Sequence, residues 1–309
     1  MIENIKPFRI LSLDGGGAKG VYTLGVLKEV EALCGKPLCE VFDLIYGTST
    51  GSIIGTALAL GWSVDDVYRA YLERVPLIMK RYTAGSRSRE LASAVKDLFG
   101  SKGADFLKTD LAIVATDYNY KRPLIFKSSI KSTYAMKKTF VPFFGVKLAD
   151  AIEASCSASP FFNIKNVNTD NQGLVSLVDG GFCANNPSIL ALVDAQHAFK
   201  IVNEDIKILS VGVGVYPLKY SMYSWLTFIP YVSARNLLSL QFDTSSNFIN
   251  SLFSLVVKEI SHVRVSDVFA EPHLATSLLE HDIIKLGKLK NKGRDSYSSK
   301  EEDIKKLLE

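Results

Sequence analysis

The sequence lacks the features of several protein classes. Its 309 residues contain four cysteines, with no CxxC pair and no histidine at zinc-finger spacing, which excludes a zinc finger and predicts free thiols in a reducing compartment. No block of five like charges is present, and lysine plus arginine exceed aspartate plus glutamate only by 36 to 32. The chain therefore offers no basic tail for a nucleic acid polymer. The cysteines are Cys34, Cys39, Cys156 and Cys183.

The sequence also lacks a recognisable leader and a convincing membrane span. Residues 1–7 contain neither a basic segment nor a long apolar run, so we expect a cytoplasmic protein. Residues 44–64 carry no charge, but glycines and hydroxyl residues interrupt their first half. This composition favours a buried strand, turn and helix over a helix that crosses a bilayer.

The composition and periodicity that are present belong to a globular α/β protein. Hydrophobic residues make up 47% of the chain and charged residues 22%, which is enough apolar material for a large core. Apolar strand patterns alternate with helical patterns, which predicts one domain, 1–309, built on a mostly parallel sheet flanked by helices. Strands are expected at 8–13, 41–45, 111–116, 123–127, 174–178 and 206–213, and helices at 21–33, 52–60, 63–75, 147–154 and 187–199.

Two segments have weaker patterns. Residues 83–105 are polar and are expected to form a surface excursion. Residues 216–257 are rich in Tyr, Phe, Leu and Ser, and we expect them to form a helical cap or insert in the C-terminal third, 216–309. The motifs described next fall in the remaining core, roughly residues 8–215.

The strongest local motif is GxSxG at Gly47–Gly51, which places Ser49 between a predicted strand and a predicted helix. A nucleophile elbow needs this context, because the tight turn lifts the serine hydroxyl out of the sheet and requires small neighbours. N–H groups at the start of the following helix point toward developing negative charge. The pattern therefore predicts that Ser49 is a catalytic nucleophile.

A glycine-rich loop at Asp14–Gly20 also lies between a strand and a helix, and it has three interpretations. Gly15, Gly17 and Gly20 satisfy the GxGxxG of a dinucleotide site, and Asp43 could be its ribose-binding acid. A phosphate loop fails, because Gly20 is followed by valine rather than Lys-Ser/Thr. The third interpretation is an oxyanion hole formed by glycine N–H groups.

The second predicted strand favours the oxyanion hole. In a dinucleotide fold that strand should end at the ribose-binding acid, but here it leads directly into the Ser49 elbow. Two neighbouring turns, one with N–H donors and one with a hydroxyl, suit acyl transfer. A dinucleotide-dependent oxidoreductase remains the alternative enzyme class, and a non-catalytic lipid- or nucleotide-binding module is a further one.

The serine needs a base, and Asp179 is the candidate. It follows the strand predicted at 174–178 and precedes Gly180 and Gly181. All four histidines come later in the chain, so a Ser, Asp, His order is formally open, but none of them lies in a recognisable loop motif. A two-residue site with Asp179 as the base is the simpler hypothesis. The histidines are His197, His262, His273 and His281.

Together these motifs resemble those of the patatin-like phospholipases, a family marked by a glycine-rich loop, a GxSxG elbow and a later DGG or DGA aspartate. The order and spacing agree over about residues 8–215. Two further blocks fit as well. They are Ala151–Pro160, a helix that ends in small residues and a proline, and Asn185–Pro187.

The resemblance implies a Ser49–Asp179 dyad that hydrolyses acyl esters of phospholipids without a metal or cofactor. It also implies an oxyanion hole at Gly15, Gly16 and Gly17. Lys19 stands where many members of the family have arginine, which keeps the charge but loses the planar fork. The supporting motif positions are Asp14, Lys19, Gly20, Gly47, Gly51, Gly180 and Gly181.

The resemblance further implies a place of action and a regulator. Some bacterial members are cytoplasmic effectors of antiphage signalling that degrade membrane lipids once a cyclic oligonucleotide binds. We therefore expect peripheral action at the inner membrane on phospholipid, a cyclic oligonucleotide as activator, and self-association into a homo-oligomer as a further property to test. No motif in the sequence locates a nucleotide pocket.

Overall fold

The computed structural model describes residues 6–133, 140–217 and 230–309, and side chains from Ala234 onward in the last range. The strands are β1 (Phe8–Leu13), β2 (Leu44–Thr48), β3 (Asp110–Asp117), β4 (Arg122–Lys127), β5 (Lys165–Thr169), β6 (Gly173–Asp179), β7 (Ile206–Val211) and β8 (Ser261–Val265). The helices are α1 (Gly20–Cys34), α2 (Thr50–Ala59), α3 (Val64–Met79), α4 (Ala84–Phe99), α5 (Leu148–Ser155), α6 (Gly181–Ala184), α7 (Ser188–His197), α8 (Pro230–Val256), α9 (Ile283–Ser298) and α10 (Glu301–Leu308).

One sheet joins all of these strands, in the order β5-β6-β3-β2-β1-β7-β8 with β4 paired to β3. The five strands from β3 to β8 pair in parallel, whereas β4, β5 and β6 pair antiparallel beside β3. The prediction of a mostly parallel sheet is confirmed. The antiparallel strands bring Asp179, at the end of β6, to the same region as the ends of the parallel strands.

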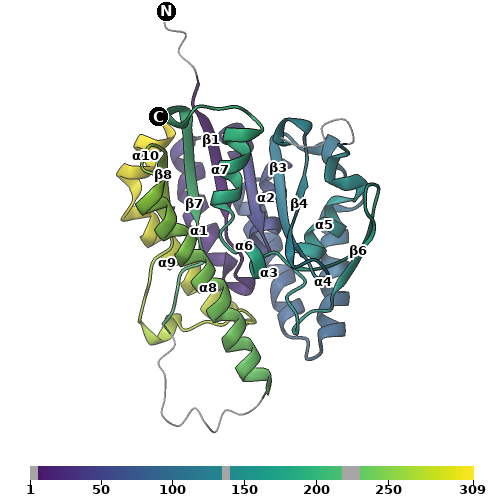
Figure 1. Ribbon diagram of the computed structural model, residues 1–309. Helices are drawn as coiled ribbons and strands as arrows, with labels where there is room; N and C mark the ends of the chain where they lie inside the picture. Colours follow the sequence, from purple (N-terminus) through teal and green to yellow (C-terminus); the bar gives the residue numbers. More distant parts are fainter. Residues whose placement is uncertain (1–5, 134–139, 218–229) are drawn as a thin grey trace, which may run out of the picture.

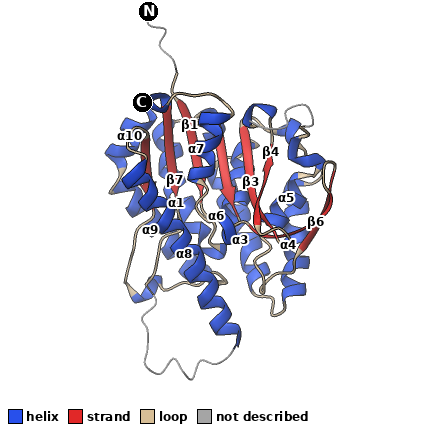
Figure 2. Cartoon of the chain, viewed as in Figure 1, coloured by secondary structure: helices blue, strands red, loops and turns tan. Residues whose placement is uncertain are grey.

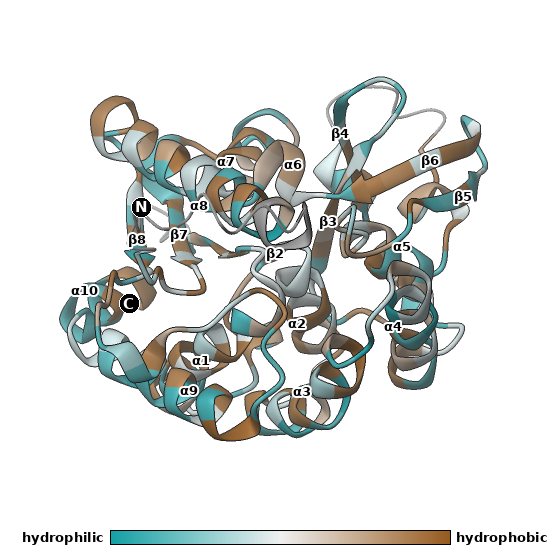
Figure 3. Ribbon diagram, turned by 90° about the horizontal axis from the view of Figure 1, so that it is seen from below, coloured by the Kyte–Doolittle hydropathy of each residue, from teal (hydrophilic) through white to brown (hydrophobic). Residues whose placement is uncertain are grey.

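Helices cover both faces of the sheet (Figures 1 and 2), and Figure 3, seen from below, separates the two layers. Helices α1, α2, α3 and α9 lie on one face, and α6, α7 and α8 on the other. Alternate strand residues serve the two cores, because successive side chains of a strand point to opposite faces. Leu11 and Ile45 belong to the larger core, while Ile10 and Leu44 belong to the smaller one.

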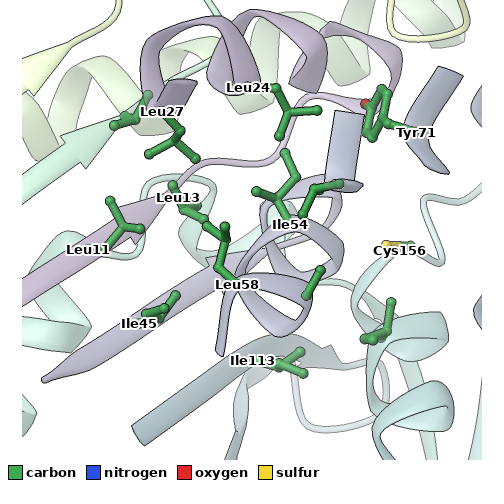
Figure 4. Packing of buried hydrophobic residues seen from close by; sticks show 14 of the residues in the cluster. Leu11, Leu13, Leu24, Leu27, Ile45, Ile54, Leu58, Tyr71, Ile113 and Cys156 are labelled. Atoms are coloured by element: carbon green, nitrogen blue, oxygen red, sulfur yellow. The ribbon is translucent and has the colours of Figure 1, made fainter. Parts of the chain in front are cut away.

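The larger core packs around α2, the helix that follows the predicted elbow. Ile54 and Leu58 of α2 lie against Leu13, Ile45 and neighbouring side chains in Figure 4, and all of them are fully buried. Burial of a leucine or isoleucine side chain stabilises a fold by roughly 1.5–3 kcal/mol. This packing holds the N-terminus of α2 rigidly at the ends of β1 and β2.

The prediction of a surface excursion at 83–105 is wrong, because most of this segment forms the helix α4. Thr83 caps the helix in a reciprocal pair with Ser86. Leu91, Val95 and Phe99 follow at a spacing of four and are buried on one face. That spacing was the available signal, and the charged residues of the opposite face obscured it.

The C-terminal third is only partly the predicted helical cap. Residues 230–256 are helical, but β8 then adds a parallel strand to the sheet beyond residue 215. The strand at 165–169 was also not predicted, and the strand expected at 41–45 begins later, at Leu44. The aromatic residues of 218–229 lie outside the described residues.

The four cysteines are free thiols, as predicted. Within the described ranges, no helix combines the length and the apolar content that a membrane span requires.

Candidate active site

Ser49 lies in a strained turn between β2 and α2. Its backbone has φ 51° and ψ −124°, a conformation that a non-glycine residue rarely adopts. The flanking glycines are required by close approach, since a Cβ on Gly47 would lie 2.5 Å from the carbonyl oxygen of Gly51. A Cβ on Gly51 would lie 2.3 Å from the carbonyl oxygen of Leu13. The structure thus has the elbow geometry that the GxSxG motif predicts.

The sheet register explains how Asp179 reaches Ser49 across 130 residues of sequence. Thr48 at the end of β2 pairs with Val114, and Asp179 at the end of β6 pairs with the next residue, Ala115. Strand β4 occupies the other edge of β3 along this stretch, so β2 and β6 arrive on the same edge from opposite directions. Their ends meet head-on, and the next residue after β2 is Ser49.

The two side chains form a direct, buried hydrogen bond. Ser49 Oγ donates to Asp179 Oδ2 at 2.6 Å, with no imidazole between them, and the N–H of Gly181 donates to Asp179 Oδ1 at 2.7 Å. Asp179 is fully buried, and Ser49 is 6% exposed. Burial raises the pKa of Asp179 to about 7, although both hydrogen bonds oppose the rise. A carboxylate with that pKa is suited to exchange a proton near neutral pH.

The small-residue block at 151–160 fastens both members of this pair. The N–H of Ser49 donates to Ser155 Oγ at 2.9 Å, and the same hydroxyl donates to the carbonyl of Val114 at 2.6 Å. The N–H of Asp179 donates to the carbonyl of Ser157 at 3.0 Å. The resemblance to the family pointed to this block. The contacts of Ser155 and Ser157 were not predicted, because a buried serine has no sequence signature of its own.

The glycine-rich loop lies against the nucleophile. A Cβ built on Gly15 would lie 3.0 Å from Ser49 Cβ. Gly17, at φ 56°, lines the same apolar pocket as Ser49, and its carbonyl accepts a hydrogen bond from the hydroxyl of Tyr71 at 2.6 Å. The loop that the sequence placed beside Ser49 is therefore adjacent to it.

One predicted oxyanion donor needs correction. The N–H of Gly15 donates to the carbonyl of Asn185 at 3.1 Å, so it is already used in this structure. Among the described residues, the N–H groups of Gly16 and Gly17 have no such partner. The candidate donors therefore narrow to Gly16 and Gly17.

Asp14 has a partner that sequence reasoning missed. Arg264 of β8 binds it in a fork, with guanidinium nitrogens 2.7 Å from Oδ1 and 2.5 Å from Oδ2. Ser246 of α8 adds a hydrogen bond to Oδ2 at 3.0 Å. Burial raises the pKa of Asp14, with Arg264 and Ser246 acting in the opposite direction. Arg264 thus holds the start of the glycine loop, although it lies 250 residues after Asp14 in the sequence.

Helix α8 packs against the glycine loop and the segment after Asp179. Lys19 is buried, and its Nζ lies 3.6 Å from a carboxylate oxygen of Asp243 on α8. Phe242 packs edge-on against Phe182 and leaves no room for a Cβ at Gly181. The helical segment predicted at 216–257 thus contacts three positions of two motifs: Asp14 and Lys19 of the glycine-rich loop, and Gly181 after the aspartate.

Ser49 and Asp179 open into a narrow pocket with an accessible volume of about 50 Å³. Its walls are almost entirely apolar and come from α2, α3, α4, the small-residue block and α8. A hydrocarbon chain is the ligand that such walls favour. The apolar residues of this wall include Ile53, Val75, Leu91, Phe161, Leu238 and Phe242.

The alternative interpretations do not fit the geometry. Asp43 precedes β2, and its carboxylate binds Lys6 and the N–H of Arg9 at the opposite end of the strand from the glycine loop. It therefore cannot act as the ribose-binding acid of a dinucleotide site. In the histidine-dependent hypothesis an imidazole would stand between the serine and the aspartate, whereas here Ser49 Oγ donates directly to Asp179.

A serine hydroxyl at a strained elbow, hydrogen-bonded directly to a buried carboxylate, is an arrangement typical of a serine hydrolase. A family model described as patatin-like phospholipase matches residues 11–192. The chain belongs to the patatin-like phospholipase family, and as a member of it is a hydrolase of lipid acyl esters.

The relatives include phospholipases named for their activators. A cUMP-AMP-activated phospholipase of Escherichia coli is 42% identical over 97% of this chain and 93% of its own length. A cGAMP-activated phospholipase of Vibrio cholerae is 30% identical over 68% of this chain and 65% of its own length. Among solved structures, VipD from Legionella pneumophila matches at 11% identity with a TM-score of 0.49, covering 98% of this chain and 67% of that one.

Proposed function

We propose that this phospholipase cleaves acyl esters of membrane phospholipids through Ser49 and Asp179. Asp179 accepts the hydroxyl proton as Ser49 Oγ attacks the ester carbonyl carbon. The tetrahedral intermediate collapses, and Asp179 returns the proton to the departing alcohol, which leaves as a lysophospholipid. A water molecule then gives a proton to Asp179 and attacks the acyl-enzyme, and Asp179 passes that proton to Ser49 Oγ as the fatty acid is released. The observation that carries the proposal is the 2.6 Å hydrogen bond between the two side chains.

The N–H groups of Gly16 and Gly17 are the proposed oxyanion donors. They belong to a loop that touches Ser49 and is fixed by Asn185, Tyr71 and the Asp14–Arg264 fork. Preorganised donors of this kind lower the barrier without reorganisation, and loss of one typically costs about 10²–10³ in rate. The apolar pocket would hold the acyl chain while the head group stays at the membrane surface.

The proposed regulator is a cyclic dinucleotide. The Escherichia coli relative covers nearly the whole chain, and its name states activation by cUMP-AMP. The name of the Vibrio cholerae relative states activation by cGAMP. Action in the cytoplasm at the inner face of the membrane, in antiphage defence and in an oligomeric form, belongs to the same proposal.

The first test is product analysis. Purified protein is incubated with vesicles of mixed bacterial phospholipids, with and without cUMP-AMP, cGAMP and cyclic di-AMP, and products are identified by mass spectrometry. We expect free fatty acid and lysophospholipid, at least about tenfold more with one of the nucleotides, and neither product with Ser49→Ala. Equal lipid cleavage by Ser49→Ala would contradict the dyad. Cleavage that no nucleotide changes would contradict the regulation alone.

The pH dependence of activity follows from Asp179. The base must be ionised, and burial raises its pKa to about 7. We therefore expect kcat/KM to rise about tenfold per pH unit below that value and to level off above it, since kcat/KM reports the free enzyme. A water-soluble short-chain ester is the suitable substrate, because its supply does not depend on the charge of a membrane. A flat profile from about pH 5 to 8 would exclude Asp179 as the base.

A further inference from the structure

A second hollow lies on the side of the sheet that β8 closes. It measures about 930 Å³ and is formed by the C-terminal end of α8, the edge strand β8 and helix α10. Figures 1 and 3 both place β8 between these two helices. The volume is at the upper end of the range for small-molecule sites, about 300–1,000 Å³. No step of the acyl-ester chemistry uses this hollow.

The charges around the hollow favour an anion. Lys258, Lys300 and Lys306 line it, against the two carboxylates of Asp267 and Asp303, and Lys300 pairs with Asp303 at 3.5 Å. Arg264 lines it as well, but Asp14 balances its charge. Lys258 and Lys306 are exposed and form no ion pair within the described part of the chain. Lysines that line one hollow without a carboxylate partner are suited to phosphate groups.

The other lining groups suit the remainder of a nucleotide. Asn250, Ser254 and Ser266 supply amide and hydroxyl groups for hydrogen bonds, and Val257 supplies apolar surface for a base. His262 packs against Phe253 with ring centroids 4.3 Å apart and a tilt of 33°, and its buried Nε2 has no hydrogen-bond partner among the described residues. Burial lowers the pKa of His262 to about 4, so the ring is neutral and can accept a hydrogen bond.

A different polar hollow, of about 480 Å³, has the opposite charge balance from the hollow beside β8. It lies at the amino ends of β2 and β3, where Lys6 and Lys108 face Glu40, Asp43 and Asp110. Its carboxylates outnumber its lysines, so it disfavours a ligand with two phosphates. The hollow beside β8 has the opposite balance.

The hollow beside β8 is joined to the active site by two elements. Arg264 lines it and also forks onto Asp14 at the start of the glycine loop. Helix α8 contributes Leu238 and Phe242 to the acyl pocket and Asn250 to this hollow. A ligand that shifts either element moves groups that touch the catalytic loops, which is the physical connection that an activator needs.

We infer that this hollow, between the C-terminal end of α8, β8 and α10, binds the activating cyclic dinucleotide, with its phosphodiesters near Lys258 and Lys306. The inference rests on the proposed function, which supplies the class of ligand. The hollow is the activator site. Binding there shifts Arg264, which contacts the glycine loop, and α8, which lines the acyl pocket.

The test is charge reversal at the two exposed lysines. Lys258→Glu/Lys306→Glu is compared with the wild type and with Lys96→Glu, an exposed lysine on α4 at the far side of the molecule (Figure 1). Binding of cUMP-AMP is measured by isothermal titration calorimetry, and the concentration for half-activation by fatty-acid release from vesicles. We expect both constants to rise at least about 30-fold in the double variant, as for loss of two charge-assisted contacts, and to stay unchanged in Lys96→Glu.

The outcomes separate the two proposals. If the wild type binds and responds to cUMP-AMP and the double variant does so equally well, the activator site lies elsewhere and the regulation stands. If the wild type neither binds nor responds to cUMP-AMP, cGAMP or cyclic di-AMP, the regulation falls and the site falls with it. Thermal unfolding of each variant confirms that the fold is retained.

Discussion

The substitution Asp179→Asn is expected to abolish activity and to stabilise the folded protein. The amide cannot accept the Ser49 proton, and removal of a general base costs about 10²–10⁴ in rate. It still occupies the same space, so its oxygen can accept from Gly181 N–H and its NH₂ can donate to Ser49 Oγ. The buried carboxylate, by contrast, destabilises the fold whenever it is ionised.

The sign of the stability change follows from the pKa of Asp179, which is 3.8 as a reference and about 7 in the folded chain. Because the folded state holds its proton more tightly, wild-type stability falls as the pH rises from about 4 to about 7. Asp179→Asn removes this loss, so its advantage is absent below about pH 4 and greatest above pH 7. We expect a gain of about 1–3 kcal/mol there, less than the full pKa difference because the amide is also buried without water.

Urea denaturation at about pH 5 and pH 8 measures this difference, and Ser49→Ala is the matched control. Ser49→Ala removes the same reaction but keeps the buried carboxylate, so it should not gain stability with rising pH. A destabilised, active Asp179→Asn would show that the base is another group.

Local backbone requirements made the centre of the site predictable. The elbow at Gly47–Gly51 and the loop at Asp14–Gly20 are readable because tight turns and close approaches leave glycine as the choice. Asp179 was found because a glycine pair follows a clear strand. Thr48 and Asp179 pair with adjacent residues of β3, and this pairing brings Asp179 to Ser49. The pairing depends on the order of the strands, which no local sequence pattern indicates.

The unpredicted parts are those fixed only by distant partners. β8 has five residues, two of them His262 and Arg264, so its composition does not resemble a buried strand. Ser246 and Arg264 reach Asp14 from 232 and 250 residues away. The availability of an N–H group, as for Gly15, is likewise a tertiary property. Sequence reasoning thus singled out Ser49 and Asp179, which the structure brings together, and missed the groups that position them.

The substitution Arg264→Gln is expected to destabilise the fold by about 3–5 kcal/mol, because it leaves a buried carboxylate without its cation. Asp14 is 2% exposed and the side chain of Arg264 13%, so water screens the pair little. Removing Arg264 also removes the main group that opposes the burial-driven rise in the Asp14 pKa. The variant should therefore recover stability as the pH falls and Asp14 takes up a proton.

The matched variants are Asp14→Asn and the double variant Asp14→Asn/Arg264→Gln. If the fork is a direct interaction, the double variant loses about 2–3 kcal/mol less than the sum of the two single losses in urea denaturation. Catalysis responds differently: kcat on a soluble ester should stay low in all three variants, since none of them holds the glycine loop through a charged fork. Additive losses of stability together with wild-type kcat would show that the fork neither holds the loop nor serves the oxyanion donors. Recovery of stability without recovery of kcat is the result expected of a positioning pair, because the fold needs only the buried charge to be neutralised, whereas Gly16 and Gly17 must be held at Ser49.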